Sequence, residues 1–173
     1  FKAYDIRGKL GHEFNEEIAY RIGRAVAKTL GAQTVVVGFD ARATSCSLAK
    51  KVMEGGCAYG ANVLDIGLAG TEEIYSAVAT FETDAGIVVT ASHNPIDYNG
   101  MKIVKHDAQP LSEKEFATVK RFSEANNFSL HPRRGLVFDR KSEARIAYLD
   151  KILKFVRLNT LEPLKIVINS GNG

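Results

Sequence analysis

Hydrophobic positions along this chain alternate between two spacings, one typical of amphipathic helices and one typical of buried strands. Apolar side chains recur every three or four residues between positions 15 and 30, which predicts a helix with one buried face: Ile18, Ile22, Val26 and Leu30. Asn15 can cap the start of this helix and Gly31 can end it. The β-branched run that follows at 34–38 predicts a buried strand.

The same alternation continues over the next hundred residues. We predict strands at 62–66, 84–89 and 136–138, and helices at about 47–59, after a cap at Thr71 and after a capping box at Ser112. Residues 125–135 are polar, contain a proline and a glycine, and predict a loop. Strands that alternate with helices favour parallel pairing through right-handed crossovers. The pattern therefore predicts an α/β fold, a layered sandwich with a mostly parallel, mixed sheet between helices.

The last part of the chain predicts a change of domain. A helix is expected from Ser142, with apolar residues again three or four apart, and a strand at 164–168 followed by a turn. We interpret residues 1–140 as one domain, 141–159 as a connecting helix and 160–173 as the start of a second α/β domain. Because the chain begins on Phe1 and stops just after a predicted strand, we expect it to be a piece of a longer protein.

The amino-acid composition limits the kinds of binding partner that we expect. Hydrophobic residues make up 45% and charged residues 25%, which is ordinary for a globular protein. The net charge is +3, and the basic residues are spread along the chain. Because nucleic-acid binding needs basic residues clustered on one face, the sequence does not predict it. No apolar run is long enough to predict a membrane span, and no signal peptide is evident. Cys46 and Cys57 form neither a disulfide framework nor a metal motif, which favours the cytoplasm.

The richest chemistry follows the predicted strand at 84–89. Ser92 offers a hydroxyl, His93 an imidazole, Asn94 an amide and Lys102 an amine, and Gly100 is expected in a turn that requires a positive φ. Open α/β sheets place reactive groups at the carboxyl ends of their strands. A serine hydroxyl is a poor nucleophile unless a base activates it or the group is already phosphorylated.

The string Thr-Ala-Ser-His-Asn-Pro around Ser92 resembles the phosphoserine loop of the α-D-phosphohexomutase superfamily, which includes phosphomannomutases and phosphoglucomutases. The resemblance implies that Ser92 carries a phosphoryl group and exchanges it with a sugar phosphate. Lys102 would serve as acid/base or neutralise phosphoryl charge, and His93 would orient the loop or move a proton. Asn94 would shape the phosphate-binding loop.

Two earlier motifs strengthen the resemblance. Tyr-Asp-Ile-Arg-Gly matches the N-terminal signature of the family and implies that Tyr4 and Arg7 lie near the phosphoserine, with Arg7 holding phosphoryl oxygens. Gly-Phe-Asp-Ala-Arg resembles a second family motif, in which Asp40 and Arg42 would support the Ser92 loop from a neighbouring strand end.

The Gly-Thr-Glu-Glu string at 70–73 and the Ile-Asn-Ser-Gly-Asn-Gly string at 168–173 look most like bacterial phosphomannomutases. These enzymes interconvert mannose 6-phosphate and mannose 1-phosphate for GDP-mannose synthesis, through a hexose 1,6-bisphosphate. The alternatives are a phosphoglucomutase or phosphoglucosamine mutase, a serine hydrolase using Ser92 and His93, and a non-catalytic folding or interaction module. Against the hydrolase, adjacent side chains on an extended loop are expected to point apart, and no Gly-x-Ser-x-Gly elbow occurs. The sequence sets no oligomeric state.

The family implies Mg²⁺ as cofactor. Its metal loop, Asp-Gly-Asp-x-Asp-Arg, does not occur in these residues. By the resemblance, the metal would meet one ligand here, a phosphoryl oxygen on Ser92, and its carboxylate ligands would lie beyond Gly173. We therefore expect the 173 residues alone to be inactive.

Overall fold

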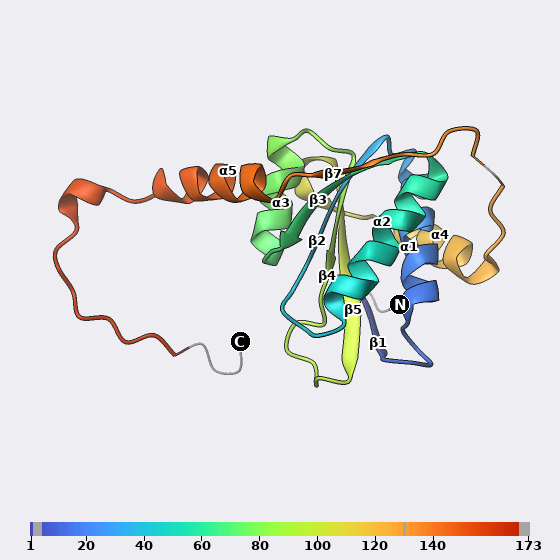
Figure 1. The fold of residues 1–173 in the computed structure, drawn as a ribbon, viewed down its shortest axis with the longest axis horizontal. Helices are drawn as coiled ribbons and strands as arrows, with labels where there is room; N and C mark the ends of the chain where they lie inside the picture. The colour runs from blue at the N-terminus through green and yellow to red at the C-terminus, as the bar shows by residue number, and fades with distance from the viewer. Residues whose placement is uncertain (2–4, 130, 170–173) are drawn as a thin grey trace.

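A mixed β-sheet between two layers of helices forms the body of the molecule (Figure 1). The computed structural model describes residues 1, 5–129 and 131–169. The strands are β1 Ile6–Lys9, β2 Thr34–Phe39, β3 Asn62–Leu68, β4 Ala85–Val89, β5 Tyr98–Lys105, β6 Gln109–Pro110 and β7 Val137–Asp139. The helices are α1 Glu16–Leu30, α2 Ser45–Tyr59, α3 Thr71–Thr80, α4 Glu113–Ala125 and α5 Lys141–Leu153, with short 3-10 turns at His106–Ala108 and Leu158–Thr160.

The sheet runs in the order β1-β5-β4-β2-β3-β7, and β6 pairs with β5. Four strands that are neighbours in the sheet are parallel, namely β4, β2, β3 and β7. Strand β5 is antiparallel to both β4 and β1. The predicted α/β sandwich with a mixed sheet is confirmed. Every residue of β4 is buried, as expected for a strand with neighbours on both edges and helices on both faces.

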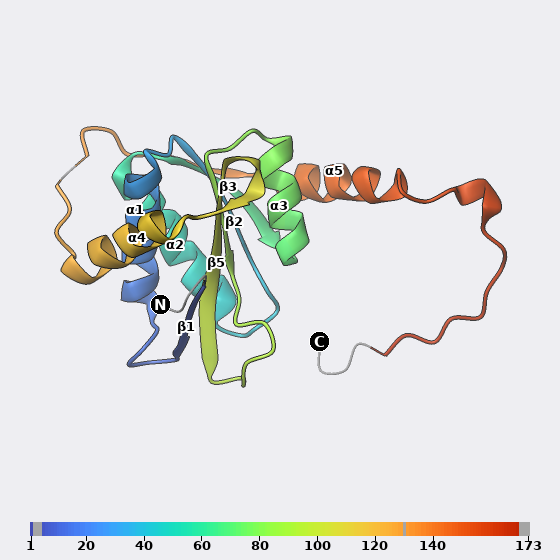
Figure 2. The ribbon, with the colours of Figure 1, turned by 180° about the vertical axis from the view of Figure 1, so that it is seen from behind.

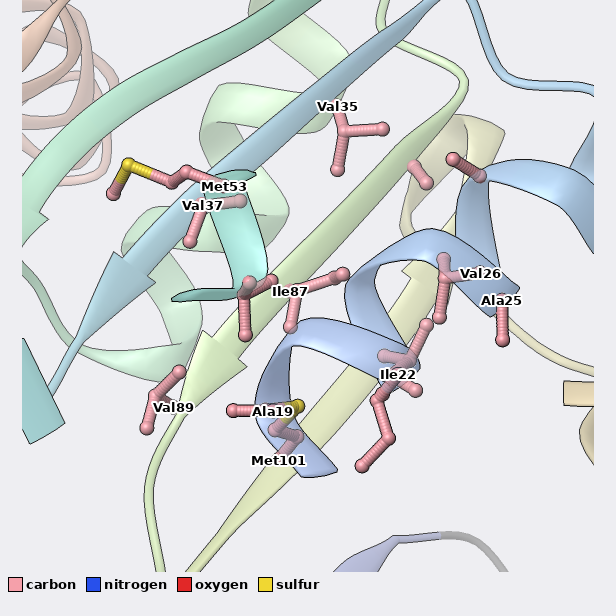
Figure 3. Close-up of a cluster of buried hydrophobic side chains, with 14 of the residues drawn as sticks. Ala19, Ile22, Ala25, Val26, Val35, Val37, Met53, Ile87, Val89 and Met101 are labelled. Atoms are coloured by element: carbon pink, nitrogen blue, oxygen red, sulfur yellow. The ribbon is translucent and has the colours of Figure 1, made fainter. Parts of the chain in front are cut away.

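Helices α1, α2 and α4 cover one face of the sheet, while α3 and α5 lie on the other (Figure 2). The larger core forms where α1 meets the sheet. Figure 3 shows Ile22 and Val26 of α1 in the same cluster of buried side chains as Ile87 of β4 and Met101 of β5. The spacing of apolar residues on α1 thus predicted the buried face correctly, since Ile22 and Val26 are fully buried.

Three of the four predicted helix caps are present, and one of them is Gly31, which ends α1 in the left-handed conformation. Asn15 accepts a hydrogen bond from the Ile18 N–H at the start of α1, and Ser112 forms a capping box with Glu115 at the start of α4. The predicted cap at Thr71 is wrong, because Gly70 is the N-cap and Thr71 is the first residue of α3. Glu73 stabilises this start by accepting a 2.8 Å hydrogen bond from the Gly70 N–H.

Strands β1 and β5 have no counterpart among the predicted elements. Gly100 was expected in a turn with a positive φ, but it lies within β5 and is absent from the residues with positive φ in the described part of the chain. The glycine has a different reason. A Cβ at Gly100 would lie 1.9 Å from the Ile6 carbonyl oxygen, so only a glycine lets β1 approach this closely.

The C-terminal region leaves the body of the molecule. Helix α5 is present as predicted, but its apolar residues Ile146 and Leu149 are 60% and 49% exposed. The strand predicted at 164–168 does not form in the described residues, and that segment is exposed and irregular (Figure 1). The turn predicted after it falls largely on Ser170–Gly173, outside the described residues. The domain boundaries stay a prediction. No helix in the described part is long and apolar enough to span a membrane.

Candidate active site

Two loops meet where the parallel strands β2 and β4 end. Residues 40–44 follow β2, and residues 90–97 follow β4 and turn back into β5. The two strands are neighbours in the sheet, with Phe39 in register with Val89, so both loops leave the sheet at one edge. This is the position at which open α/β sheets place functional groups.

Ser92 sits on an unusual backbone in the second of these loops. Its φ is +52°, in the left-handed region that non-glycine residues seldom occupy. The Ser92 N–H donates a 2.9 Å hydrogen bond to Thr90 Oγ1, and Asn94 ties the loop together through two bonds to the Ala91 carbonyl. Ser92 itself is exposed. Its hydroxyl is therefore presented to solvent from a loop that internal hydrogen bonds hold in shape.

His93 lies closer to Ser92 than the sequence predicted. The Ser92 Oγ is 3.5 Å from His93 Nδ1, so the expectation that adjacent side chains point apart is wrong. The reason is the left-handed backbone at Ser92, which breaks the extended alternation of side chains. His93 is exposed, and in the described structure no carboxylate contacts its ring. These residues thus form a Ser-His pair without the third group that orients the imidazole in a hydrolase triad.

Arg42 clamps the Ser92 loop from the neighbouring strand end. Its guanidinium donates hydrogen bonds to the carbonyl oxygens of Ser92 at 2.9 Å, Pro95 at 2.8 Å and Tyr98 at 3.1 Å, and also to that of Asn94. The Arg42 side chain is only 16% exposed. Four backbone acceptors on one guanidinium fix both the start and the end of the loop.

Asp40 holds Arg42 in turn. Its carboxylate accepts a 3.0 Å hydrogen bond from the Arg42 N–H and lies 3.6 Å from Arg42 Nε. It also accepts a 2.5 Å hydrogen bond from the Ser45 hydroxyl at the start of α2. Arg42 therefore contacts the Ser92 loop directly, and Asp40 supports Arg42. The polar groups of both side chains are used in these contacts rather than presented to a substrate.

Arg7 offers an unused donor beside the loop. Its side chain is 6% exposed and pairs with Asp5 at 3.0 Å, yet its Nη1 is buried with no hydrogen-bond partner in the described structure. Arg7 is in register with Gly100, whose carbonyl accepts a hydrogen bond from the Thr90 N–H. A buried cationic donor with no acceptor, one strand away from the Ser92 loop, fits the binding of an anion.

Lys102 lies two residues further along β5, in register with Val88 of β4. Side chains two apart on a strand share a face, so Lys102 is on the same face as Gly100 and Arg7. It is partly exposed and forms no hydrogen bond or ion pair with any described residue. Ser92, His93, Arg7 and Lys102 thus come to one edge of the sheet, while Tyr4 lies outside the described residues.

The polar residues that Asn99 contacts behind the loop, Thr44 and Ser45, escaped the sequence interpretation. Asn99 is fully buried, and its amide donates to Thr44 Oγ1 and Ser45 Oγ, both at 2.9 Å. Asn99-Gly100 suggested a turn, so its strand was missed. The signal that could have revealed it is the apolar content of the next four residues, since Met101, Ile103 and Val104 follow this dipeptide directly.

The described residues contain no group of three or more His, Cys, Asp or Glu side chains placed to hold a metal ion. Mg²⁺ is normally held by carboxylates together with substrate phosphates. Around Ser92 the donors are a hydroxyl, an imidazole, an amide and two cations, which do not by themselves make a magnesium site.

Comparison with known proteins identifies the family and the fold. Residues 1–130 match the family described as phosphoglucomutase/phosphomannomutase, alpha/beta/alpha domain I. Phosphomannomutases of Salmonella montevideo and Vibrio cholerae are 49% and 44% identical to the whole chain, which covers 38% of each. A crystal structure of a phosphoglucomutase/phosphomannomutase family protein from Burkholderia thailandensis superposes with a TM-score of 0.75 at 31% identity, over 88% of this chain and 35% of that one.

The chain belongs to the phosphoglucomutase/phosphomannomutase family, and residues 1–130 form its α/β/α domain I. A structure of a phosphomannomutase-like protein from Thermus thermophilus shares the fold, with a TM-score of 0.77 at 24% identity over 92% of this chain and 36% of that one. The chain spans about 38% of the length of the curated relatives it matches.

Proposed function

We propose that this chain is the phosphoserine-bearing part of a phosphomannomutase, which interconverts mannose 6-phosphate and mannose 1-phosphate. The observation that carries the proposal is the presentation of Ser92, an exposed hydroxyl on a left-handed backbone whose loop is clamped by Arg42. Identity of 49% to phosphomannomutases over the whole chain supports this reaction class.

The proposed reaction consists of two phosphoryl transfers, and Ser92 gives up a phosphoryl group in the first and regains one in the second. In the first, O1 of mannose 6-phosphate attacks the phosphorus on Ser92 Oγ, the P–O bond to Ser92 breaks, Ser92 Oγ takes up a proton, and the proton of the O1 hydroxyl passes to a base. The product is a hexose 1,6-bisphosphate. The sugar then turns over, Ser92 Oγ gives up its proton as it attacks the phosphorus at O6, the P–O6 bond breaks, and O6 takes up a proton. Phosphoryl transfer of this kind depends on positioning and on cations around the phosphoryl oxygens.

The described side chains divide these tasks. Arg7, with its free buried Nη1, holds a phosphoryl oxygen. Lys102 neutralises phosphoryl charge or exchanges the proton of the sugar hydroxyl, and His93, 3.5 Å from Ser92 Oγ, assists this proton movement. Asn94 keeps the loop in the shape that presents Ser92. Bound Mg²⁺ would supply further positive charge at the phosphoryl group, with Ser92 contributing its phosphoryl oxygen and the carboxylate ligands coming from elsewhere in the enzyme.

Two substitutions in the full-length protein test these roles. Ser92→Ala should abolish conversion of mannose 1-phosphate, because the acceptor oxygen is gone, while Ser47→Ala, an exposed serine on α2, should leave it unchanged. Lys102→Ala should lower kcat on the order of a hundredfold through loss of one charged group at the reacting centre. The matched control is Lys50→Ala, an exposed lysine on the same helix as Ser47.

The proposal fails if Ser92→Ala retains most of the wild-type rate. Lys102 loses its role if its variant behaves like Lys50→Ala. Parallel assays with glucose 1-phosphate and glucosamine 1-phosphate determine the sugar preference, and a rate with either that greatly exceeds the rate with mannose 1-phosphate would overturn the assignment of substrate.

A further inference from the structure

Behind the Ser92 loop lies a closed ring of buried and partly buried polar contacts. Asn99 Nδ2 donates to Ser45 Oγ at 2.9 Å, and Ser45 Oγ donates to Asp40 at 2.5 Å. Asp40 contacts the backbone N–H and the guanidinium of Arg42. Arg42 in turn donates a 3.1 Å hydrogen bond to the carbonyl of Tyr98, the residue that precedes Asn99. The ring therefore returns to the residue from which it starts.

The members of the ring come from three separate segments of the chain. Asn99 lies on β5, Ser45 is the first residue of α2, and Asp40 and Arg42 belong to the loop after β2. Asn99 and Ser45 are both fully buried, so water does not compete for their hydrogen bonds. Asn99 also sits between the two residues that bond the loop, because Tyr98 accepts from Arg42 and Gly100 accepts from Thr90.

We propose that Ser45 and Asn99 are positioning residues for phosphoryl transfer, acting on Ser92 through Asp40 and Arg42. This inference rests on the proposed function for its catalytic consequence, but its structural content does not. Neither side chain reaches solvent, and the side-chain contacts of Ser45 lead to Ser92 through Asp40 and the guanidinium of Arg42. A second path runs along the backbone from Asn99 to Gly100 and through Thr90 to the Ser92 N–H. Their polar groups fix where that guanidinium sits, and the guanidinium fixes the carbonyls on both sides of Ser92.

Ser45→Ala is the sharpest perturbation. It removes one hydroxyl at a helical position where alanine is well tolerated, and leaves Asp40 and Asn99 each with one partner fewer. The matched control is Ser76→Ala, a buried serine on α3 whose hydroxyl has no partner in the described structure. A second variant, Asn99→Leu, keeps the branched shape of the side chain and removes the amide.

The first readout is amide hydrogen exchange of residues 91–98, which needs no activity. Ser45→Ala should accelerate exchange there about tenfold, since one buried charge-assisted contact is lost, and Ser76→Ala should not. Asn99→Leu should accelerate it at least as much. The second readout is mutase kinetics in the full-length protein, where kcat should fall about tenfold while KM for the sugar phosphate changes less than twofold.

The decisive test is a double-mutant cycle with Arg42→Met. If Ser45 acts through Arg42, adding Ser45→Ala to Arg42→Met should change neither loop exchange nor kcat by more than about twofold. Equal effects of Ser45→Ala in both backgrounds would overturn the proposal, as would unchanged exchange of 91–98 in both Ser45→Ala and Asn99→Leu. If the wild-type protein transfers no phosphoryl group, the proposed function fails, yet the exchange measurements still confirm or reject the ring.

Discussion

Gly100→Ala tests the reason for the glycine beside Arg7. An alanine Cβ would lie 1.9 Å from the Ile6 carbonyl oxygen and 3.0 Å from Arg7 Cδ. The oxygen belongs to the backbone and cannot rotate away, so β1 must move from β5 by about 1 Å or more. The register joins four residues of β1 to β5, so this shift stretches or breaks the ladder along the whole strand.

The cost follows from these contacts. Overpacking typically costs 1–3 kcal/mol and each weakened ladder hydrogen bond about 1 kcal/mol, so we expect the free energy of unfolding to fall by about 2–3 kcal/mol. The cost does not rise much further, because β1 is at the edge of the sheet and can detach on its own. Since Arg7 moves with β1, phosphoryl transfer should fall at least about tenfold at temperatures where the protein stays folded.

Urea unfolding of the chain and mutase assays of the full-length protein measure the two effects. The control is Gly56→Ala, where the nearest atom to an added Cβ is a valine methyl carbon at 3.3 Å and the helix gains propensity, so stability should change by less than about 1 kcal/mol. A Gly100→Ala protein within about 0.5 kcal/mol of wild type would refute the argument from close approach.

Three further predictions concern the rest of the domain. Arg42→Met should lower kcat about a hundredfold and expose the 91–98 loop to proteolysis without changing the helical CD signal, because four carbonyls lose their donor together; an intact loop in this variant would contradict it. Hydrogen bonds from Ser112 and Lys105 lower the pKa of Glu115 to about 2 from its ordinary 4.5, so its stabilisation is full above pH 5 and is lost as the pH falls towards 2. Glu115→Ala should therefore cost about 1–2 kcal/mol at pH 7 and progressively less below pH 4.5 in urea titrations; a constant difference would be evidence against it. Burial raises the pKa of the Cys57 thiol, whereas Cys46 is exposed, so a thiol reagent should modify one cysteine in the native protein and two after unfolding, which mass spectrometry of labelled peptides checks.

Elements with a strong local pattern could be predicted from the sequence. The buried face of α1, its cap at Asn15 and the capping box at Ser112 depend on residues within a few positions of one another, and all three are present. The parallel part of the sheet followed from the alternation of strands with helices, and β4, which is buried throughout, has the continuous hydrophobic run expected of a strand covered on both faces.

Features that depend on distant contacts could not be predicted. The dipeptide Asn99-Gly100 resembles a turn locally. In the fold, the Asn99 side-chain amide donates a hydrogen bond to Ser45 at the start of α2, and Gly100, which has no side chain, lets β1 approach β5 closely. The contacts of Arg42 escape prediction for a related reason, because its partners are backbone carbonyls, which every residue has and no sequence pattern marks. The spacing of apolar residues on α5 predicted a helix, but it did not predict that the apolar face of this helix is largely exposed.

The most direct test of the central claim is the intact mass of the full-length protein before and after incubation with a hexose 1,6-bisphosphate, and again after phosphatase treatment. We expect the bisphosphate to add one phosphoryl group, phosphatase to remove it, and peptide mapping to place it on Ser92. The Ser92→Ala protein should gain no mass under the same conditions. A wild-type protein that never gains a phosphoryl group, or one that carries it on another residue in both proteins, would contradict the account.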